Sequence, residues 1–564
     1  MRQVAKSENR AAVIVAVAVV VLVAIRTQFG ISFFDDSFYA AVPMRLASGA
    51  HLFTDEATIQ AIGSLVAVPF TVAWRGLFGL NGIVLALRLF YVALAAALGW
   101  AVVRALKPSF GALVSTVAVC SVLLAPAYNT FAVSYNTTAQ LASMLSLSLV
   151  VAAWRDGSRV AACGAGALTA MAAVFYPPFA VAALPTAVVA IVLLRKRWLW
   201  LWLIGGAAAA LGVGAAWLLL TVPAADVTRA INHAFGVGYA GGGTSVTIAD
   251  RVALALRDAS RIAHSRSWWP AMGLSVLVAI PLRSVRVRAV LATVLPLAVA
   301  IPGYLALTRG TPWTFGVPVL SYLLAFTLSL VPLALVTGVR RDARRPDLRV
   351  FLLLTGVFSA CAVPLVLVTT SAGFVGGMSG LGATPFALAA GICWLVLIGE
   401  WAGSRAVFAA VAVLLAVQLA LLFSMAYKDG APLALKTRVA HGAVAGILTT
   451  PERAADIAGV ERALGKVIKP GSRLLVVNAP LVYALTDARP FTYSTWVNPG
   501  PSDVGVVDYY QRVGMTPDIV VVSRGFMSAA NDSVPADPGD PLLSWVAGRY
   551  EVVDRVGYVI LRRR

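Results

Sequence analysis

The feature that most constrains this chain is a series of apolar runs, each about as long as a bilayer is thick. A helix needs roughly 20 apolar residues to cross the hydrocarbon core, and such runs recur between residues 11 and 426. Only 12% of the 564 residues are charged, about half the fraction of a typical soluble domain. We therefore predict a polytopic α-helical membrane protein with a small soluble domain at its C-terminal end.

The hydropathy pattern predicts about 13 transmembrane helices. The first follows a basic lead of Arg2, Lys6 and Arg10, and no small-residue cleavage site comes after it, so we interpret it as an uncleaved signal-anchor. The expected spans lie near residues 11–28, 83–104, 109–127, 138–154, 159–175, 179–194, 198–221, 268–283, 288–307, 314–338, 350–370, 384–401 and 405–426.

Basic residues divide the loops between these spans into two classes. The short loops near residues 128–137, 176–178, 308–313 and 371–383 contain a single arginine, Arg309. Because cytoplasmic loops carry an excess of Lys and Arg, we expect a cell-membrane protein with a cytoplasmic N-terminus and an extracytoplasmic C-terminal domain. The alternate loops hold Arg104, Lys107, Arg155, Arg159, Arg195, Lys196, Arg197, Arg283, Arg286, Arg288, Arg340, Arg341, Arg344, Arg345, Arg349 and Arg405.

One further apolar segment, residues 58–80, is left out of this count. Counting it as a span would reverse every later loop and place the arginine clusters outside. Pro69 and three glycines also interrupt it. We expect a helix pair along the outer interface, with Trp74 and Arg75 at the water boundary; a full span is the alternative.

The last part of the chain, residues 427–564, differs in composition and predicts a small α/β domain. It carries no GxGxxG or P-loop pattern, so nucleotide binding is not expected. Contact with an acceptor, or covering of a cavity, is the expected role. Its buried strands are expected at 473–478 and 518–523, a closing hairpin at 550–553 and 558–561, and helices near 452–467 and 506–514.

Composition excludes several other classes of protein. The net charge of +20 sits mostly in short loops between spans, where membrane orientation accounts for it, so no nucleic-acid partner is expected. No internal repeat and no matched halves are visible, which disfavours a carrier. Neither a disulfide framework nor a thiolate metal site is expected, because all four cysteines lie inside apolar runs without CxxC spacing: Cys120, Cys163, Cys361 and Cys393.

Adjacent carboxylates follow the first span, at Asp35 and Asp36. Acids beside a membrane are costly and commonly functional. The aromatic and apolar residues that follow indicate a short helix on the membrane surface, where neighbouring side chains point about 100° apart. One acid is then expected to face a cavity while the other is solvated, capping or bound. The alternative is a solvated acidic helix start, since acids suit a helix N-terminus.

This stretch resembles a known superfamily. An acidic pair in the first outer loop is the hallmark of the GT-C glycosyltransferases, and Asp35-Asp36-x-x-Tyr39-Ala40 is most similar to the branch that holds protein O-mannosyltransferases and the aminoarabinose transferase of lipid A. That branch has an Arg that opens the next span, a place that Arg88 fits. A second acid is common in its next outer loop, where this chain has Asn136.

The resemblance implies a GT-C-like transmembrane domain over residues 1–426, with a catalytic outer loop at 29–82. It also implies transfer of a sugar from a polyprenyl-phosphate donor to a hydroxyl of a glycan, lipid or protein on the outer face. A carboxylate within reach of that hydroxyl accepts its proton, and a single displacement inverts the sugar carbon. We expect Asp35 to be the base, and Asp36 to orient it, bind a sugar hydroxyl or hold a divalent cation.

A lipid-phosphate donor requires positive charge near the outer interface. Arg257, Arg261 and His264 are spaced to share one helix face and so to meet one phosphate. A basic helix resting on anionic lipid headgroups is the alternative. Arg88 and Arg309 are lesser phosphate candidates, since each of them also suits a side chain that snorkels to the interface.

Three further points stay open at this level. Asp55 and Glu56 form a second acidic pair, which lines the acceptor path or caps the following helix. No cofactor is firmly implied, and metal-ligand spacing is missing around the four histidines, His51, His233, His264 and His441. The competing function is a transporter or flippase of lipid-linked glycans, which predicts charged residues at the midplane of several spans rather than at the outer rim.

Overall fold

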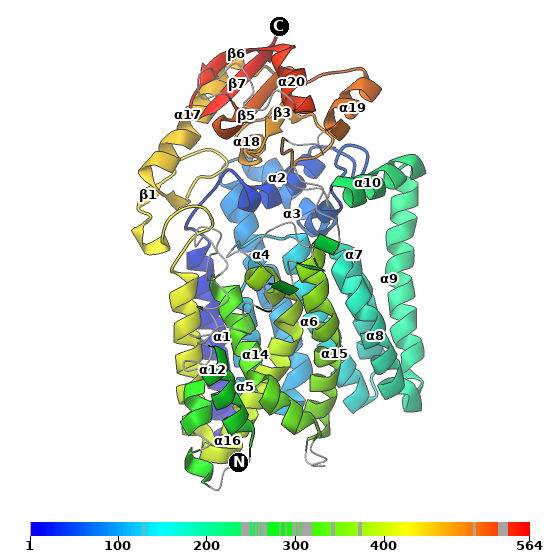
Figure 1. Cartoon of the computed structure of the whole chain (residues 1–564), viewed down its shortest axis with the longest axis vertical. Coiled ribbons are helices and arrows are strands. Elements are labelled where there is room, and N and C mark those ends of the chain that lie inside the picture. The colour runs from blue at the N-terminus through cyan, green and yellow to red at the C-terminus, as the bar shows by residue number, and fades with distance from the viewer. Residues whose placement is uncertain are drawn as a thin grey trace.

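The computed structural model places a long helical bundle beneath a small sheet domain (Figure 1). The N-terminus lies at the end of the bundle away from the sheet domain, and the C-terminus lies at the top of that domain (Figure 1). The structure describes residues 2–127, 130–237, 268–280, 318–339, 345–369, 375–499, 504–527 and 540–564, together with scattered residues between 249 and 305.

The bundle is built from helices of very different length. Its first half contains α1 (Arg2–Arg26), α2 (Asp35–Ala47), the 3-10 helix η1 (Ile59–Ala67), α3 (Val68–Phe78), α4 (Ile83–Phe110), α5 (Ala112–Leu123), α6 (Tyr135–Asp156), α7 (Arg159–Phe175), α8 (Pro177–Leu194), η3 (Arg195–Arg197), α9 (Leu199–Thr221) and α10 (Ala224–Val237). The described helices of its second half are α12 (Trp268–Ala279), α14 (Pro318–Val339), α15 (Pro346–Thr369) and α16 (Val375–Leu422).

Local sequence explains where several of these helices begin and end. The Ser134 side chain accepts a hydrogen bond from the Thr137 backbone, and Thr137 reciprocates, which makes a capping box at the start of α6. Gly157 ends α6 in the left-handed region at φ 69°, a conformation that favours glycine. Ser158 then caps α7. The α6–α7 connection is therefore tight, and the two helices pack against each other.

Among the described residues, nine helices are long and apolar enough to cross a membrane. The multi-pass prediction is therefore confirmed, whereas the count of 13 is not. Helices α5 and α7 coincide with expected spans but have only 12 and 17 residues, and the span expected at 288–307 lies largely outside the described part. The expected spans at 384–401 and 405–426 fall within α16, which Gly403 divides at φ 77°.

Basic residues gather at the end of the bundle far from the sheet domain. Arg155, at the end of α6, donates to Ser109 at the end of α4 at 2.8 Å. Arg197, between α8 and α9, donates to the carbonyl of Arg155 at 3.3 Å. The Ser109 hydroxyl in turn bonds Asp347, at the start of α15. The loops that the sequence groups by positive charge thus meet at one end of the molecule.

The segment excluded from the expected spans lies at the opposite end. Helices α2, α3 and α10 sit between the bundle and the sheet domain (Figure 1). Helix α3 packs on α2 and α4, and Arg75 on α3 bonds Ser48 just after α2. By length and composition η1 and α3 together qualify as a span, but they lie across the end of the bundle beside α2 in this structure.

The sheet domain confirms the strands and helices that its sequence predicts. Its sheet has the order β4-β3-β5-β7-β6, in which β3 pairs in parallel with β4 and β5, and β7 pairs antiparallel with β5 and β6. A separate pair of strands lies between α16 and α17. The elements are β1 (Thr437–Arg438), β2 (Leu448–Thr449), α17 (Pro451–Val467), β3 (Arg473–Val477), α18 (Leu481–Ala484), β4 (Arg489–Pro490), α19 (Val504–Val513), β5 (Ile519–Ser523), α20 (Pro541–Ala547), β6 (Tyr550–Arg555) and β7 (Tyr558–Arg563).

Backbone hydrogen bonds join the sheet domain to the loop that carries the acidic pair. Gly30 donates to the Leu448 carbonyl at 2.8 Å, and Leu448 donates to Gln28 at 2.7 Å. Ala57 donates to the carbonyl of Tyr493 at 2.9 Å. The loop after α1 is therefore fixed between the bundle and the sheet domain.

Candidate functional site

The acidic pair lies in the first turn of α2, as the sequence predicts. Phe34 precedes the helix without a side-chain cap, and the carboxylates supply the negative charge that a helix N-terminus favours. Asp36 is buried, with 6% of its side chain exposed, whereas the side chain of Asp35 is 34% exposed. Two acids that are neighbours in sequence thus occupy different environments.

Asp36 is held by an arginine and a serine. Its Oδ2 atom accepts from Arg88 Nη2 at 3.2 Å and from the Ser32 backbone at 3.1 Å. Its Oδ1 atom accepts from the Ser32 hydroxyl. Burial raises the pKa of Asp36, and the charge of Arg88 and the hydrogen bonds from Ser32 oppose that rise. Every contact fixes the side chain in place, so Asp36 is suited to positioning the start of α2.

Arg88 belongs to the same network, and its role as a phosphate contact stays a prediction. Its Nη1 atom donates to the carbonyls of Thr27 at 2.9 Å and Gly30 at 2.8 Å, while Nη2 binds Asp36. The side chain is 10% exposed. Arg88 thus ties the end of α1 to α2 and α4 and has little surface left for a ligand.

Asp35 is the accessible member of the pair. Its Oδ2 atom lies 3.9 Å from Nζ of Lys428, on the turn after α16. Burial raises the pKa of Asp35 to about 6, although the ammonium of Lys428 opposes the rise. A partly exposed carboxylate with a pKa near neutral is suited to accept and release a proton at physiological pH.

Aromatic rings lead from α2 into the bundle. Tyr39, one turn after Asp35, lies 6.2 Å from the ring of Tyr135 at the start of α6, measured between centroids. Tyr135 lies 5.6 Å from Tyr176, and Tyr176 lies 5.1 Å from Phe179 on α8. Phe179 in turn meets Phe358 on α15 at 5.1 Å. These rings form a continuous apolar path from the acidic pair to a cavity.

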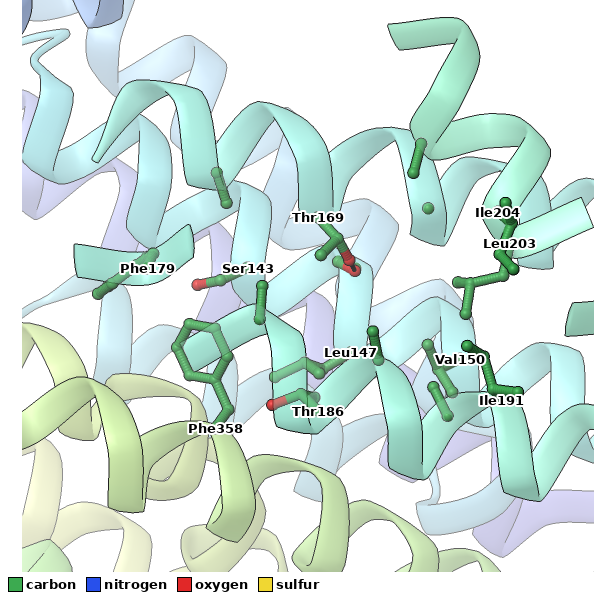
Figure 2. Close-up of a pocket in the computed structure, with 17 residues that line it drawn as sticks. Ser143, Leu147, Val150, Thr169, Phe179, Thr186, Ile191, Leu203, Ile204 and Phe358 are labelled. Atoms are coloured by element: carbon green, nitrogen blue, oxygen red, sulfur yellow. Dashed lines mark hydrogen bonds between the residues drawn. The ribbon is translucent and has the colours of Figure 1, made fainter. Parts of the chain in front are cut away.

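The cavity lies among helices α6, α7, α8, α9 and α15, and about 640 Å³ of empty space, part of it open to the surroundings, lies within its bounds. Phe179 and Phe358 line one end of it, and Ile191, Leu203 and Ile204 line the other (Figure 2). Four hydroxyl groups in its wall donate hydrogen bonds to backbone carbonyls at 2.8–2.9 Å. They belong to Ser143, Ser146, Thr169 and Thr186. The cavity therefore presents an apolar wall inside the bundle.

Asn136 lies at the position where the GT-C branch that the sequence resembles commonly has a second acid. It lies in the first turn of α6 beside Tyr135, and the residue is 1% exposed. Its side chain is therefore closed off from solvent. The geometry places Asn136 near the site but gives it no direct route to a solvent-borne acceptor.

The second acidic pair has a structural role at the domain junction. Glu56 is fully buried and binds Arg45 Nη1 at 2.9 Å, and it accepts from the Thr495 backbone at 2.8 Å. Arg45 also donates to the carbonyls of Asp55 and Thr492. Glu56 Oε1 also accepts from the Thr58 backbone at 3.2 Å, directly before η1, so the alternative that this pair caps the following helix stays a prediction, as does a contact with the acceptor. The Asp55 side chain accepts from the His51 backbone at 2.8 Å, which closes a turn in the same loop.

Of the remaining phosphate candidates, the structure describes only Arg257. Arg257 is exposed, and no contact joins it to Asp35 among the described residues. Arg261, His264 and Arg309 lie outside the described residues. Within the part of the chain that the structure describes, no group of three or more His, Cys, Asp or Glu side chains gathers as a set of metal ligands.

Two residues of the site escape sequence reasoning. Ser32 precedes Asp36 by four positions, and Lys428 lies almost 400 residues away. The signal for Lys428 is a basic residue that directly follows the last apolar run, a position shared by many charges that only mark a membrane boundary. Nothing in its spacing connects it to Asp35.

Comparison with known proteins gives likenesses in structure only. No family model matches the chain, and no curated protein matches it. The crystal structure of ArnT from Cupriavidus metallidurans bound to undecaprenyl phosphate is similar over 98% of this chain and 97% of that chain, with a TM-score of 0.40 and 15% sequence identity. At so low an identity, the roles of residues in ArnT cannot be assigned to residues of this chain.

Proposed function

We propose that this protein is a membrane glycosyltransferase of the GT-C type, which moves a sugar from a polyprenyl-phosphate donor to an acceptor hydroxyl. One observation carries the proposal. Adjacent carboxylates at the end of the bundle are held in different states, with Asp36 buried against Arg88 and Asp35 partly open beside Lys428. If the acids served only to start a helix, both could be solvated. A buried ion pair that fixes one acid while its neighbour stays accessible would then have no purpose.

The chemistry follows from the state of Asp35. The acceptor oxygen attacks the sugar carbon, its proton passes to Asp35, and the electron pair of the broken carbon–oxygen bond leaves with the phosphate. Phosphate is a stable leaving anion, so the demand for proton transfer falls on the acceptor hydroxyl. A single displacement of this kind inverts the sugar carbon, by analogy with inverting glycosidases. Asp36 acts as a positioning residue for the helix start.

The apolar cavity suits the lipid part of such a donor. Its wall is hydrocarbon because the hydroxyls of Ser146 and Thr169 are bonded to the Ala165 carbonyl. Burying a long isoprenoid chain there removes apolar surface from water, at about 25 cal/mol per Å². Tyr39 lies one helix turn after Asp35. The row of rings that starts with Tyr39 ends at Phe179 and Phe358, which line one end of the cavity.

The arrangement of charge supports an outward-facing site. The basic loops gather at the end of the bundle that is far from Asp35, and Lys and Arg mark the cytoplasmic side. We therefore place the acidic pair and the sheet domain outside. Asp487→Cys in the sheet domain should react with a membrane-impermeant maleimide in intact cells, and Ser158→Cys between α6 and α7 should react only after lysis. The reverse pattern would refute the orientation.

The function is tested with two single variants. Purified protein is supplied with polyprenyl-phosphate-linked arabinose or mannose, and the released polyprenyl phosphate is measured. Asp35→Asn should lower turnover about 10²–10⁴-fold, the usual worth of a general base, while donor binding persists. Asp36→Asn should also lower turnover, and Asp487→Asn, an exposed acid of the sheet domain, should not. Full activity in Asp35→Asn with a donor that wild type consumes would exclude Asp35 as the base.

A further inference from the structure

The turn that follows α16 holds a lysine in an unusual backbone conformation. Lys428 has φ 48°, in the left-handed region that non-glycine residues rarely occupy. Ala426 donates to the Gly430 carbonyl at 2.9 Å and closes the turn. The carboxylate of Asp429 accepts from the Ile31 backbone at 3.0 Å and from Thr449 at 2.6 Å. The turn is therefore pinned to the segment that leads into α2.

This turn delivers an ammonium group to the accessible acid. Nζ of Lys428 lies 4.0 Å from the centroid of the Phe34 ring and 3.9 Å from Oδ2 of Asp35. A cation over an aromatic face and beside a carboxylate is held by two attractions at once. The side chain is 24% exposed, so a ligand can still reach it.

Arg88, the other cation close to the acidic pair, differs in this respect. Two backbone carbonyls and Asp36 occupy its donors. Lys428 instead carries its charge on a compact group at the end of a flexible four-carbon stem, with three rotatable donors. It can therefore approach a new anion without giving up its position over Phe34.

We propose that Lys428 is the cationic contact for the phosphate of the lipid-linked donor at the Asp35 site. This rests on the proposed function. When the carbon–oxygen bond of the donor breaks, the phosphate gains one negative charge, and a fixed cation stabilises charge that develops in this way. Before the donor arrives, the same ammonium pairs with Asp35 and favours its ionised form.

Binding of a short lipid phosphate tests the contact without any transfer assay. Full-length protein in detergent is titrated with farnesyl phosphate, farnesol and inorganic phosphate. Lys428→Met should weaken farnesyl phosphate binding about tenfold or more, as expected for a lost bond to a charged group, and leave farnesol binding unchanged. Lys428→Arg should retain most of the affinity. The control is Lys436→Met, an exposed lysine eight residues further on.

The outcomes separate the two proposals. Equal farnesyl phosphate binding by wild type and Lys428→Met would overturn the role of Lys428 and leave the glycosyltransferase intact. Wild type that binds neither farnesyl compound would count against the lipid donor itself. Inorganic phosphate that binds as tightly as farnesyl phosphate, and is lost equally in Lys428→Met, would assign the contact to free phosphate. Thermal unfolding of each variant excludes a loss of binding through misfolding.

A pH profile supplies a second readout. The titratable and charged groups that face Asp35 are Asp36, Tyr135 and Lys428. Without the ammonium, burial and the like charge of Asp36 should raise the pKa of Asp35 further, so the acid limb of activity should move to higher pH in Lys428→Met and stay in place in Lys428→Arg. An acid limb that is the same in wild type and Lys428→Met would contradict the pairing with Asp35.

Discussion

At the scale of single residues, the difference between Asp35 and Asp36 comes from their partners and not from their sequence. Asp36 accepts from Ser32 and Arg88, whereas the ion pair of Asp35 among the described residues is with a partly exposed ammonium at 3.9 Å. A buried charge without full pairing shifts its own pKa toward the neutral form. Burial raises the pKa of both acids, and it raises that of Asp35 to about 6, so Asp35 changes its protonation near neutral pH.

Activity should therefore depend on pH through Asp35. A base acts in its ionised form, and burial raises the pKa of Asp35 to about 6. The value of kcat/KM should rise with pH through a midpoint near 6 and level off above it, since this parameter reports groups of the free enzyme. Initial rates between pH 4.5 and pH 8.5 measure the limb. A midpoint near pH 4 would show that the acid is not desolvated.

The same pKa shift predicts a stability change with a defined sign. The pKa of Asp35 is raised from 3.8 to about 6, so folding favours the protonated form, and stability is lost as pH rises from the unfolded to the folded value. Asp35→Asn removes that loss. Its melting temperature should exceed that of wild type by an amount that grows between about pH 4 and pH 6 and is constant above. A variant less stable than wild type at pH 8 would contradict this sign.

At the scale of elements, Arg88 joins three parts of the chain: the end of α1, the first turn of α2 and helix α4. Arg88→Met leaves Asp36 buried without its charge partner, which typically costs roughly 3–5 kcal/mol. Denaturant unfolding in detergent should show this loss. Asp36→Asn combined with Arg88→Met should recover part of it, because the unpaired charge is gone. Additive losses in the double variant would mean that the two residues do not interact.

Helices α7 and α9 approach closely because two glycines face their backbones. A Cβ atom on Gly166 would overlap the Leu203 carbonyl, and one on Gly206 would overlap the Cys163 carbonyl. Small residues permit this kind of contact between membrane helices. Both helices also line the apolar cavity, so their separation sets its width.

Gly206→Val should therefore push α9 away from α7. Overpacking of this kind costs about 1–3 kcal/mol, and it should also weaken binding of farnesol, since the cavity wall moves. Gly205→Val is the matched control, because no atom lies within 4 Å of its Cβ position. Equal melting temperatures and equal farnesol affinities for the two variants would refute the close packing.

At the scale of the whole molecule, sequence reasoning succeeds where the determinants are local. Apolar runs predict most helices of the bundle. In the sheet domain, short strand-like segments between helix-like ones predict β3, β5 and the β6–β7 hairpin. The first turn of α2 was placed by the acids themselves. These features depend on neighbours a few residues apart, which a hydropathy pattern records directly.

Contacts between distant segments were not predictable in the same way. Arg45 and Glu56 meet Thr495 across almost 450 residues, a junction that the sequence of the acidic pair does not indicate. Lys428 reaches Asp35 through a turn fixed by Asp429. Helix α5 is shorter than the span expected at 109–127, and it begins directly after Gly111, whose φ of 84° is not helical.

The junction at Glu56 leads to a prediction for how the sheet domain is held. Glu56 is fully buried against Arg45, whose side chain is 2% exposed, so Glu56→Gln leaves an arginine charge buried without its partner, at a cost of roughly 3–5 kcal/mol. The sheet domain should then separate from the loop more often. Hydrogen exchange should rise around residues 492–495 and at Ala57, whose amide bonds Tyr493.

A surface ion pair of the same domain is the control for this prediction. Glu551 and Arg562 lie 3.0 Å apart with about half of each side chain exposed, and such pairs contribute about 0–1 kcal/mol. Glu551→Gln should leave both exchange and melting temperature nearly unchanged. Because α2 carries Arg45 at one end and Asp35 at the other, Glu56→Gln should also lower sugar transfer. Unchanged exchange at residues 492–495 would show that the sheet domain is held by its other contacts alone.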